Sequence, residues 1–394
     1  MNKSTVWKLI PMMFSFFIMG FVDLVGIATN YMKEDFKLTE SMAGLLPSMV
    51  FLWFLIFSIP TGILMNKIGR KNTVLLSLVI TILALAIPFI SYNYGMMLIF
   101  CCLLGIGNTL LQVSLNPLIS SVVTGDKLAS SLTFGQFLKA IASFSAPIIA
   151  VWAATSLNDW KLLFPIFMVI SILAVILLGI TKVNEPDKSI KTSSFSDCFK
   201  LLGDQTILLC FIGILCTVGL DVGVNVMAPK LFIERLGWSI EKAGYATSVY
   251  FLFRTIGSFL GAFILAKFSS RIFYIISVAC IFIALSLLFV AQNDAILYFD
   301  VAILYSAIAI IGFGNANLFS IFFSKALLNK PNHQNEVSGL MVMGISGGAI
   351  FPLLMGFAAD ALQSQNAAVI VLCFTALYFL VMIPKLKSAP SELK

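Results

Sequence analysis

Residues 20–30 read Gly-Phe-Val-Asp-Leu-Val-Gly-Ile-Ala-Thr-Asn and contain one acidic residue, Asp23. This stretch lies inside an apolar run from about residue 9 to residue 32, long enough to cross a bilayer as a helix of about 20 residues. A carboxylate at that depth costs at least about 2.5 kcal/mol unless it faces a partner or water. We therefore expect Asp23 to have a function.

The same pattern returns in the second half of the chain. Residues 218–225 read Val-Gly-Leu-Asp-Val-Gly-Val-Asn, and Asp221 again lies in a long apolar run. An Ala-Gly pair follows each run, at 43–44 and at 243–244. The pattern predicts two copies of one helical bundle, and duplicated halves with polar groups at the midplane are typical of secondary transporters.

The composition is that of a membrane protein. Hydrophobic residues make up 60% of the 394 residues and charged residues 11%, against about 45–50% and 25% in soluble proteins. The mean hydropathy of +1.02 agrees. The first apolar run is too long for a cleaved signal and carries Asp23, so we expect it to remain in the mature protein. The fold class predicted is an all-α polytopic membrane protein.

Twelve apolar runs are predicted to be transmembrane helices, in two pseudo-symmetric bundles of six: 9–32, 42–65, 72–91, 95–122, 129–154, 162–181, 206–230, 243–266, 272–292, 297–323, 337–359 and 366–384. The polar residues 182–205 are predicted to be a cytoplasmic linker between an N-terminal bundle, 1–181, and a C-terminal bundle, 206–394. The net charge of +7 lies largely in loops on one face. By the positive-inside rule this predicts a plasma membrane protein with both termini cytoplasmic, and no nucleic-acid partner.

The loop after the second run carries a dense motif. Residues 62–71 read Gly-Ile-Leu-Met-Asn-Lys-Ile-Gly-Arg-Lys, which resembles the signature loop of the major facilitator superfamily, Gly-x-Leu-x-Asp-Arg-x-Gly-Arg-Lys. The resemblance implies a gating role for Gly62, Asn66, Gly69, Arg70 and Lys71. In that family the loop's Asp locks against the start of span 11, and here Asn66 replaces it. A weaker echo covers residues 261–271.

Three further segments carry a narrower resemblance, to the fucose permease-like branch of that superfamily. They are residues 111–117 in span 4, 315–324 in span 10 and 342–360 in span 11, and the segment around Asp221 also resembles the branch's span 7. The resemblance implies transport of a monosaccharide, L-fucose or another hexose, with a proton. The branch's titratable acid in span 4 corresponds to Gln112, which cannot carry a proton.

Four charges are expected at midplane depth, namely Asp23, Lys139, Asp221 and Arg254. They sum to zero, and in lipid they must pair or face an aqueous cavity. They either form fixed ion pairs or line the transport cavity. Asp23 is the first candidate for the proton carrier and Asp221 the second, while sodium coupling stays open because carboxylates and carbonyls also suit a hard cation.

Neutral hydrogen-bonding groups are the candidates for binding a sugar. Asn108, Gln112 and Asn116 share one face of span 4 at four-residue spacing, and Gln136 shares a face of span 5 with Lys139. The remaining candidates are spread over three spans: Asn225, Tyr250, Arg254 and Asn315. Tyr250 and Trp53 are aromatic faces on which a sugar ring could stack.

These patterns predict a monomeric proton-coupled symporter of a monosaccharide that works by alternating access in a bacterial inner membrane. No nucleotide-binding loop, metal cluster or nucleophile elbow occurs, and six of the seven Cys fall in apolar runs, so we expect neither an enzyme nor a metal or other cofactor. An alternative is transport of an anionic sugar, a hexuronate or sialic acid, through Lys139 and Arg254. A drug/proton antiporter is less favoured because of the midplane amides, and the short loops disfavour a receptor or scaffold.

Overall fold

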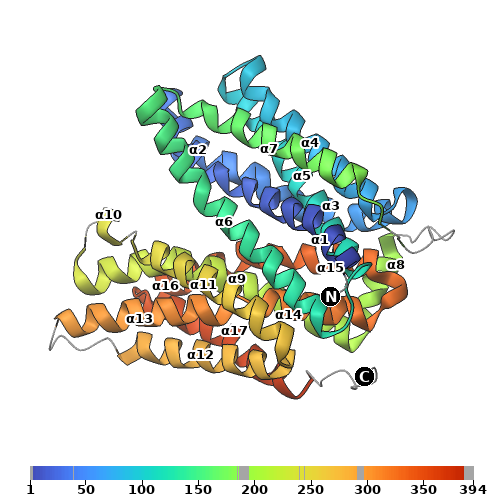
Figure 1. The fold of residues 1–394 in the computed structure, drawn as a ribbon. Helices are drawn as coiled ribbons and strands as arrows, with labels where there is room; N and C mark the ends of the chain where they lie inside the picture. The colour runs from blue at the N-terminus through green and yellow to red at the C-terminus, as the bar shows by residue number, and fades with distance from the viewer. Residues whose placement is uncertain are drawn as a thin grey trace. The chain divides into compact units, whose positions relative to one another are not determined.

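The structure is a computed structural model that describes residues 3–38, 40–183, 185, 195–238, 240–243, 245–290 and 297–385. Every regular element within these ranges is a helix, as Figure 1 shows. The α-helices are α1 (Lys3–Met19), α2 (Leu24–Asp35), α3 (Glu40–Ile68), α4 (Arg70–Ile90), α5 (Tyr94–Ser120), α6 (Asp126–Leu157), α7 (Leu163–Ile180), α8 (Phe195–Lys200), α9 (Gln205–Leu236), α10 (Ile240–Ala243), α11 (Tyr245–Lys267), α12 (Ser270–Val290), α13 (Leu297–Asn315), α14 (Leu318–Asn329), α15 (Gln334–Met343), α16 (Gly347–Leu362) and α17 (Asn366–Met382). The short 3-10 helices are η1 (Gly20–Asp23), η2 (Trp160–Leu162), η3 (Leu201–Gly203), η4 (Pro331–His333), η5 (Gly344–Ser346) and η6 (Ile383–Lys385).

Eleven stretches of the described residues are long and apolar enough to cross a membrane. The first predicted span is not among them because η1 interrupts it. Its two parts, α1 and α2, have 17 and 12 residues. The interruption falls on Gly20–Asp23, so the acidic residue of the first span lies at an irregularity of the helix and not inside a regular turn. With this interrupted helix, the described elements match the twelve predicted spans.

Contacts divide the chain into two units. Unit 1 comprises 1–124, 135–204 and 327–343, and unit 2 comprises 125–134, 205–326 and 344–394. Two segments, 125–134 and 327–343, therefore belong to the unit that is built mainly from the other half of the chain. The predicted six-helix bundles with boundaries at 181 and 206 stay a prediction, and linker residues 184 and 186–194 lie outside the described residues.

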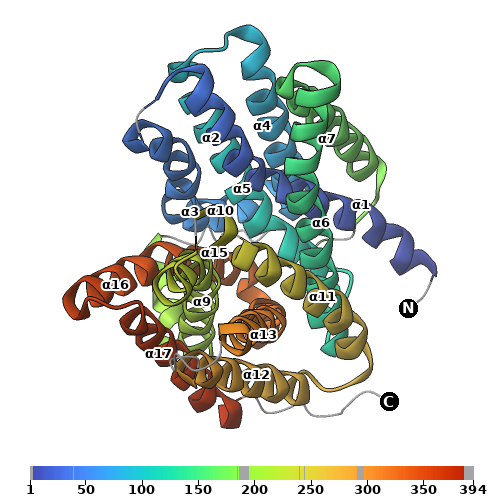
Figure 2. The same ribbon diagram turned by 90° about the vertical axis from the view of Figure 1, so that its left-hand side faces the viewer.

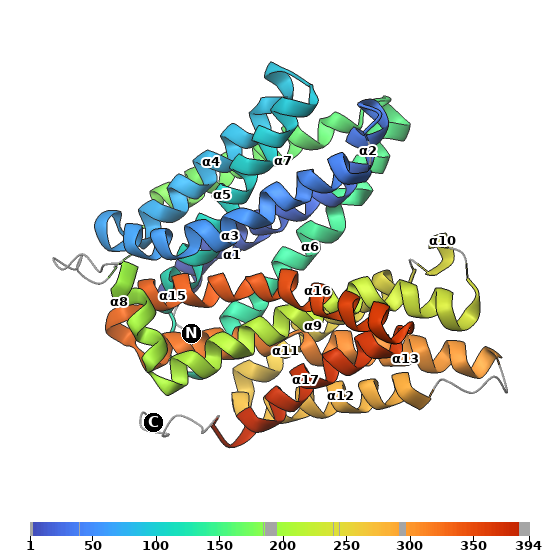
Figure 3. The ribbon, with the colours of Figure 1, turned by 180° about the vertical axis from the view of Figure 1, so that it is seen from behind.

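Within unit 1, α5 packs along α4 and α3, and α4 also packs on α7, which Figure 3 shows from behind. Within unit 2, α13 packs between α11 and α12 and also contacts α9; Figure 2 views α13 nearly along its axis. Two predicted spans are each divided into two helices. Ala316 and Asn317 separate α13 from α14, and η5 separates α15 from α16. Interrupted membrane helices are where many transporters place their binding sites.

The same close packing recurs in both units and supports the predicted duplication. A Cβ at Gly105 on α5 would lie 2.5 Å from the carbonyl oxygen of Val50 on α3. A Cβ at Gly312 on α13 would lie at the same 2.5 Å from the carbonyl oxygen of Tyr250 on α11. Small residues let membrane helices approach this closely. Gly312 thus corresponds to Gly105, and Tyr250 to Val50.

An aromatic and acidic cluster closes one end of unit 1. Asp35 at the end of α2 accepts hydrogen bonds from the Tyr92 hydroxyl at 2.5 Å and from Trp160 Nε1 at 3.1 Å. The rings of Tyr31 and Trp160 stack with their centroids 5.0 Å apart. Burial and then the hydrogen bond to Asp35 raise the pKa of Tyr92. Tyr92 is therefore a neutral hydroxyl donor at physiological pH, and the cluster ties α2 to the start of α5 and to η2.

Candidate functional site

An ion pair lies on α9 and α11 of unit 2. The Arg254 guanidinium, at Nη2, lies 3.2 Å from Asp221 Oδ2, and Tyr250, one helical turn before Arg254, donates its hydroxyl to Asp221 Oδ1 at 2.5 Å. The side chains of Arg254 and Asp221 are 32% and 17% exposed. Both carboxylate oxygens are engaged, and the pair carries no net charge. Tyr250 is fully buried, so its hydroxyl rather than its ring face is the group that it contributes here.

Two amides flank this ion pair. Asn315, at the end of α13, donates from Nδ2 to the Thr217 carbonyl oxygen and to the Tyr250 hydroxyl, each at 3.2 Å. Asn225 donates from Nδ2 to the Asp221 carbonyl oxygen at 2.8 Å. Thr217 and Asn225 lie one turn before and one turn after Asp221 on one face of α9. The buried Oδ1 atoms of Asn315 and Asn225 have no hydrogen-bond partner among the described residues.

The first acidic residue, Asp23, has different surroundings. It is exposed, and it accepts a hydrogen bond from the Ser143 hydroxyl of α6. Close approach brings the two elements together, because a Cβ at Gly20 would lie 2.4 Å from the Lys139 carbonyl oxygen. Lys139 and Gln136 are half-buried on the same helix, α6. Unit 1 therefore presents a carboxylate next to the predicted span 5 residues.

The span 4 amides bond to the backbone and to one another. Asn108 Nδ2 donates to the Met19 carbonyl oxygen at 2.7 Å, and Gln112 Nε2 donates to Asn108 Oδ1 at 2.8 Å. Asn116 Nδ2 donates to the Gln112 carbonyl oxygen at 2.8 Å, while its own buried Oδ1 has no partner among the described residues. All three side chains are buried. The three amides therefore share one face of the helix, as predicted, and the Asn108 side chain has both its hydrogen-bond partners within the protein.

The two halves use equivalent asparagines differently. Asn108 bonds to the Met19 carbonyl oxygen of the first span as Asn315 bonds to that of Thr217 in the seventh. Asn108 Oδ1 receives the Gln112 amide, whereas one turn after Asn315 the chain has Phe319, which has no amide to give. Asn315 Oδ1 is thus buried without a hydrogen-bond donor among the described residues.

The signature loop meets the start of α15 inside unit 1. Asn66 Nδ2 donates to Glu336 Oε1 at 2.5 Å, and Asn335 Nδ2 donates to Asn66 Oδ1 at 2.6 Å. Gly62 allows this contact, since a Cβ there would lie 2.7 Å from the Asn335 carbonyl oxygen. Glu336 lies in the first turn of α15 and is 4% exposed. The carboxylate that Asn66 lacks is thus supplied from the other side of the contact.

Arg70 joins three segments at this point. Its Nε donates to Asn335 Oδ1 at 2.8 Å. Its Nη1 donates to the Pro117 carbonyl oxygen at 2.9 Å and to the Ser121 hydroxyl at 2.8 Å. These bonds link α4 to the end of α5 and to α15, so the arginine of the motif is a structural hub of unit 1.

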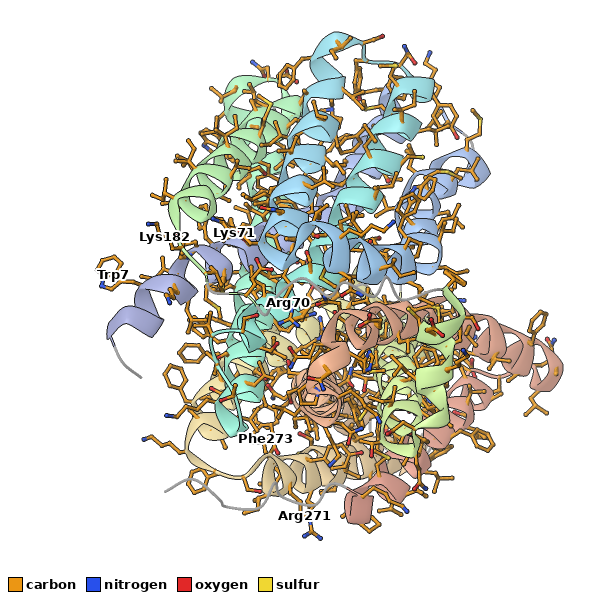
Figure 4. All side chains as sticks on the ribbon, turned by 90° about the vertical axis from the view of Figure 1, so that its right-hand side faces the viewer. Trp7, Arg70, Lys71, Lys182, Arg271 and Phe273 are labelled. Carbon is orange, nitrogen blue, oxygen red and sulfur yellow. The ribbon has the colours of Figure 1, made fainter. Side chains whose placement is uncertain are left out.

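A linker residue, Glu185, caps the start of α4. Its two carboxylate oxygens accept the backbone N–H groups of Arg70 at 2.6 Å and Lys71 at 2.8 Å. Gly69, with φ of +92°, makes the turn that exposes these N–H groups. Lys71 Nζ donates to the Thr181 carbonyl oxygen at 2.9 Å, and Figure 4 shows Lys71 beside Lys182. A carboxylate at a helix N-terminus is stabilised by the helix dipole.

Sequence reasoning did not single out four residues of these contacts: Ser143, Glu185, Asn335 and Glu336. The position of Glu336 in the first turn of a helix is a usual place for an acidic residue, but its partner Asn66 lies 270 positions away. Such long-range pairing leaves no trace in local spacing.

The fold and the sites described above are those of a polytopic helical membrane protein with two repeated units and buried polar sites. Residues 11–351 match the family model of the Major Facilitator Superfamily. The chain belongs to this superfamily, and it is a membrane transporter and not an enzyme. The all-helical fold class and the superfamily predicted from the sequence are confirmed.

Curated relatives match nearly the whole chain. A glucose/galactose transporter of Brucella abortus is 26% identical over 96% of this chain and 94% of its own length. A putative glucose/galactose transporter of Helicobacter pylori strain J99 is 24% identical over 96% of this chain and 95% of its own. The crystal structure of the Escherichia coli fucose:proton symporter has a TM-score of 0.82 at 18% identity, covering 98% of this chain and all of that one. That structure supports the fold.

Proposed function

We propose that this protein is a proton-coupled symporter of a neutral monosaccharide. Two observations support a sugar as the substrate. Relatives named as glucose/galactose transporters match 96% of the chain, and buried amides lie on α5 and α13. Amide groups donate and accept hydrogen bonds, as sugar recognition requires. In this proposal the protein acts as a monomer in the plasma membrane, with both termini cytoplasmic, and needs no cofactor besides the coupling ion.

The observation that carries the coupling mechanism is the contrast between the two repeated carboxylates. Asp221 is ion-paired with Arg254, whereas Asp23 is exposed and receives a neutral hydroxyl from Ser143. Neutralising Asp221 would break up a partly buried ion pair, which is costly. Asp23 is therefore the proton carrier, and Asp221 is retained as the partner of Arg254. Gln112 at the branch's acidic position leaves span 4 to hydrogen bonding.

Transport in proteoliposomes tests this function. Radiolabelled D-glucose, D-galactose, L-fucose and D-glucuronate are offered with an inward proton gradient, an inward sodium gradient, or neither. We expect proton-driven accumulation of at least one neutral sugar. The Asp23→Asn variant should lose accumulation but keep sugar exchange at equilibrium, whereas Asp197→Asn, at a surface pair with Lys200, should behave as wild type.

The contrary outcomes are distinct. Sodium-driven uptake, or proton-driven accumulation that survives in Asp23→Asn, refutes the coupling mechanism. Uptake of none of the sugars refutes sugar transport. Uptake of D-glucuronate alone establishes the anionic-sugar alternative.

A further inference from the structure

The site on unit 2 contains two acceptors that the protein does not fill. Asn315 Oδ1 and Asn225 Oδ1 are buried and have no hydrogen-bond partner among the described residues. The Asn315 side chain is only 2% exposed. A buried acceptor left without a donor costs about 1–3 kcal/mol. A ligand that donates hydrogen bonds here recovers that cost.

The first half of the chain shows what such a donor looks like. In unit 1 the equivalent oxygen, Asn108 Oδ1, receives the amide of Gln112 at 2.8 Å. In unit 2 Phe319 follows Asn315 at that position of the sequence, so the protein offers no amide there. The repeat therefore has no amide donor for Asn315 Oδ1 at the position where unit 1 has Gln112.

The nearby charges are already balanced. Both oxygens of Asp221 are engaged, one by Arg254 at 3.2 Å and one by the Tyr250 hydroxyl. The residues of the first half that correspond to Tyr250 and Arg254 are Val50 and Phe54, and both are buried. The ion pair is therefore particular to unit 2. A substrate carboxylate would compete with Asp221 for Arg254, and it has no proton to give to Asn315.

We propose that these groups set the charge selectivity of the transporter: Asn315 Oδ1 accepts a hydroxyl of a neutral sugar, and Asp221 occupies Arg254 so that anionic sugars are rejected. This inference rests on the proposed function and deepens it. Asp221 acts through Arg254 and is a positioning residue, while Asn315 touches the sugar.

Competition in counterflow tests the charge rule without needing ion coupling. Proteoliposomes loaded with D-glucose take up labelled D-glucose in the presence of unlabelled D-galactose or D-glucuronate. Wild type should be inhibited by the hexose and not by the acid. In Asp221→Asn, D-glucuronate should gain apparent affinity by about tenfold or more, because the guanidinium no longer faces the Asp221 carboxylate and can bind that of the sugar through charge-assisted bonds.

A double variant separates charge from folding. Asp221→Asn/Arg254→Gln removes both charges, and it should lose the gained affinity for D-glucuronate. Asp197→Asn is the matched control, since its ion pair with Lys200 lies on the surface of α8. If Asp221→Asn does not yield folded protein, Asp221→Ser takes its place in the test of charge selectivity, and the double variant is compared with it.

Asn315→Leu tests the hydroxyl acceptor. This substitution should lower the apparent affinity for D-glucose by roughly tenfold, which corresponds to the loss of one hydrogen bond in a buried site. Singly deoxygenated analogues of D-glucose identify the hydroxyl that Asn315 binds. Wild type should bind one of these analogues more weakly than D-glucose, whereas Asn315→Leu should bind that analogue and D-glucose equally well. A purely structural role for Asn315 would weaken all analogues equally and would overturn the assignment.

Two results overturn the charge rule while sugar transport stands. One is inhibition of wild type by D-glucuronate as strong as by hexoses. The other is folded Asp221→Asn that transports hexose and gains no affinity for the acid. A wild type that transports no sugar refutes the proposed function itself.

Discussion

Asn66 donates its amide to the Glu336 carboxylate across 270 positions of the sequence, with 2.5 Å between the two atoms. The superfamily's signature motif has an acid at the first of these positions. Here the acid lies on the partner segment, and the motif position carries the donor. The contact keeps its hydrogen bond with the roles of the two sides exchanged.

Exchanging the two residues tests this contact. Asn66→Asp alone places two carboxylates together in a buried site, and we expect the unfolding free energy to fall by about 1–3 kcal/mol. Asn66→Asp/Glu336→Gln restores one acid and one amide and should recover most of the loss. Thermal unfolding of the purified protein in detergent measures both. Equal stability of wild type and Asn66→Asp would contradict the inverted contact.

The two close glycine contacts should respond alike. A Cβ at Gly105 or at Gly312 would lie 2.5 Å from a backbone carbonyl oxygen, which cannot move as a flexible side chain can. We expect Gly105→Ala and Gly312→Ala each to cost about 1–3 kcal/mol of stability. Gly179→Ala is the control, because a Cβ there meets nothing within 4 Å. A large effect in only one of the two units would argue against equivalent packing.

Removing the linker cap should weaken α4. Glu185→Ala leaves the N–H groups of Arg70 and Lys71 without their carboxylate, which we expect to cost about 1 kcal/mol. Glu185→Gln keeps an acceptor oxygen and loses only the charge, so its effect should be smaller. The midpoint of thermal unfolding is the measurement, and Asp197→Asn serves as the surface control. An unchanged midpoint in Glu185→Ala would refute the cap.

The linker helix α8 offers a chemical reporter. Cys198 is fully buried, and burial followed by the nearby Glu336 raises the pKa of its thiol to about 11. Only the thiolate reacts, so maleimide labelling at neutral pH should be about a hundredfold slower than for an ordinary thiol and should speed up toward alkaline pH.

The comparison needs a background in which the other six cysteines are replaced. Ser196→Cys with Cys198→Ser puts an exposed thiol on the same helix and should label rapidly. Equal labelling rates at the two positions would show that α8 does not cover Cys198.

The broad fold was predictable because its signals are local. Apolar runs, basic loops and the repeated acids Asp23 and Asp221 need only short windows of sequence to be recognised. The interruption of the first span at Gly20–Asp23 was not predicted, since the run stays apolar on both sides of it. At this point Gly20 lies close to α6, a long-range contact that the local sequence does not reveal.

The candidate site was predicted in its residue types but not in its pairings. Arg254 and Asp221 were both expected at midplane depth, yet their ion pair requires α9 and α11 to pack together. Asn108 and Asn315 looked equivalent as buried amides. Their difference, one oxygen filled by Gln112 and one left open, depends on what stands one turn further along each helix.

The exchanged segments of the two units bear on how such a chain arose. Residues 125–134 and 327–343 each join the unit built mainly from the other half, and they include the beginnings of the fifth and eleventh spans, which are equivalent in the repeat. Reciprocal exchange of the same element is what a domain-swapped homodimer shows. Neither half of the chain on its own therefore contains all the residues of one unit.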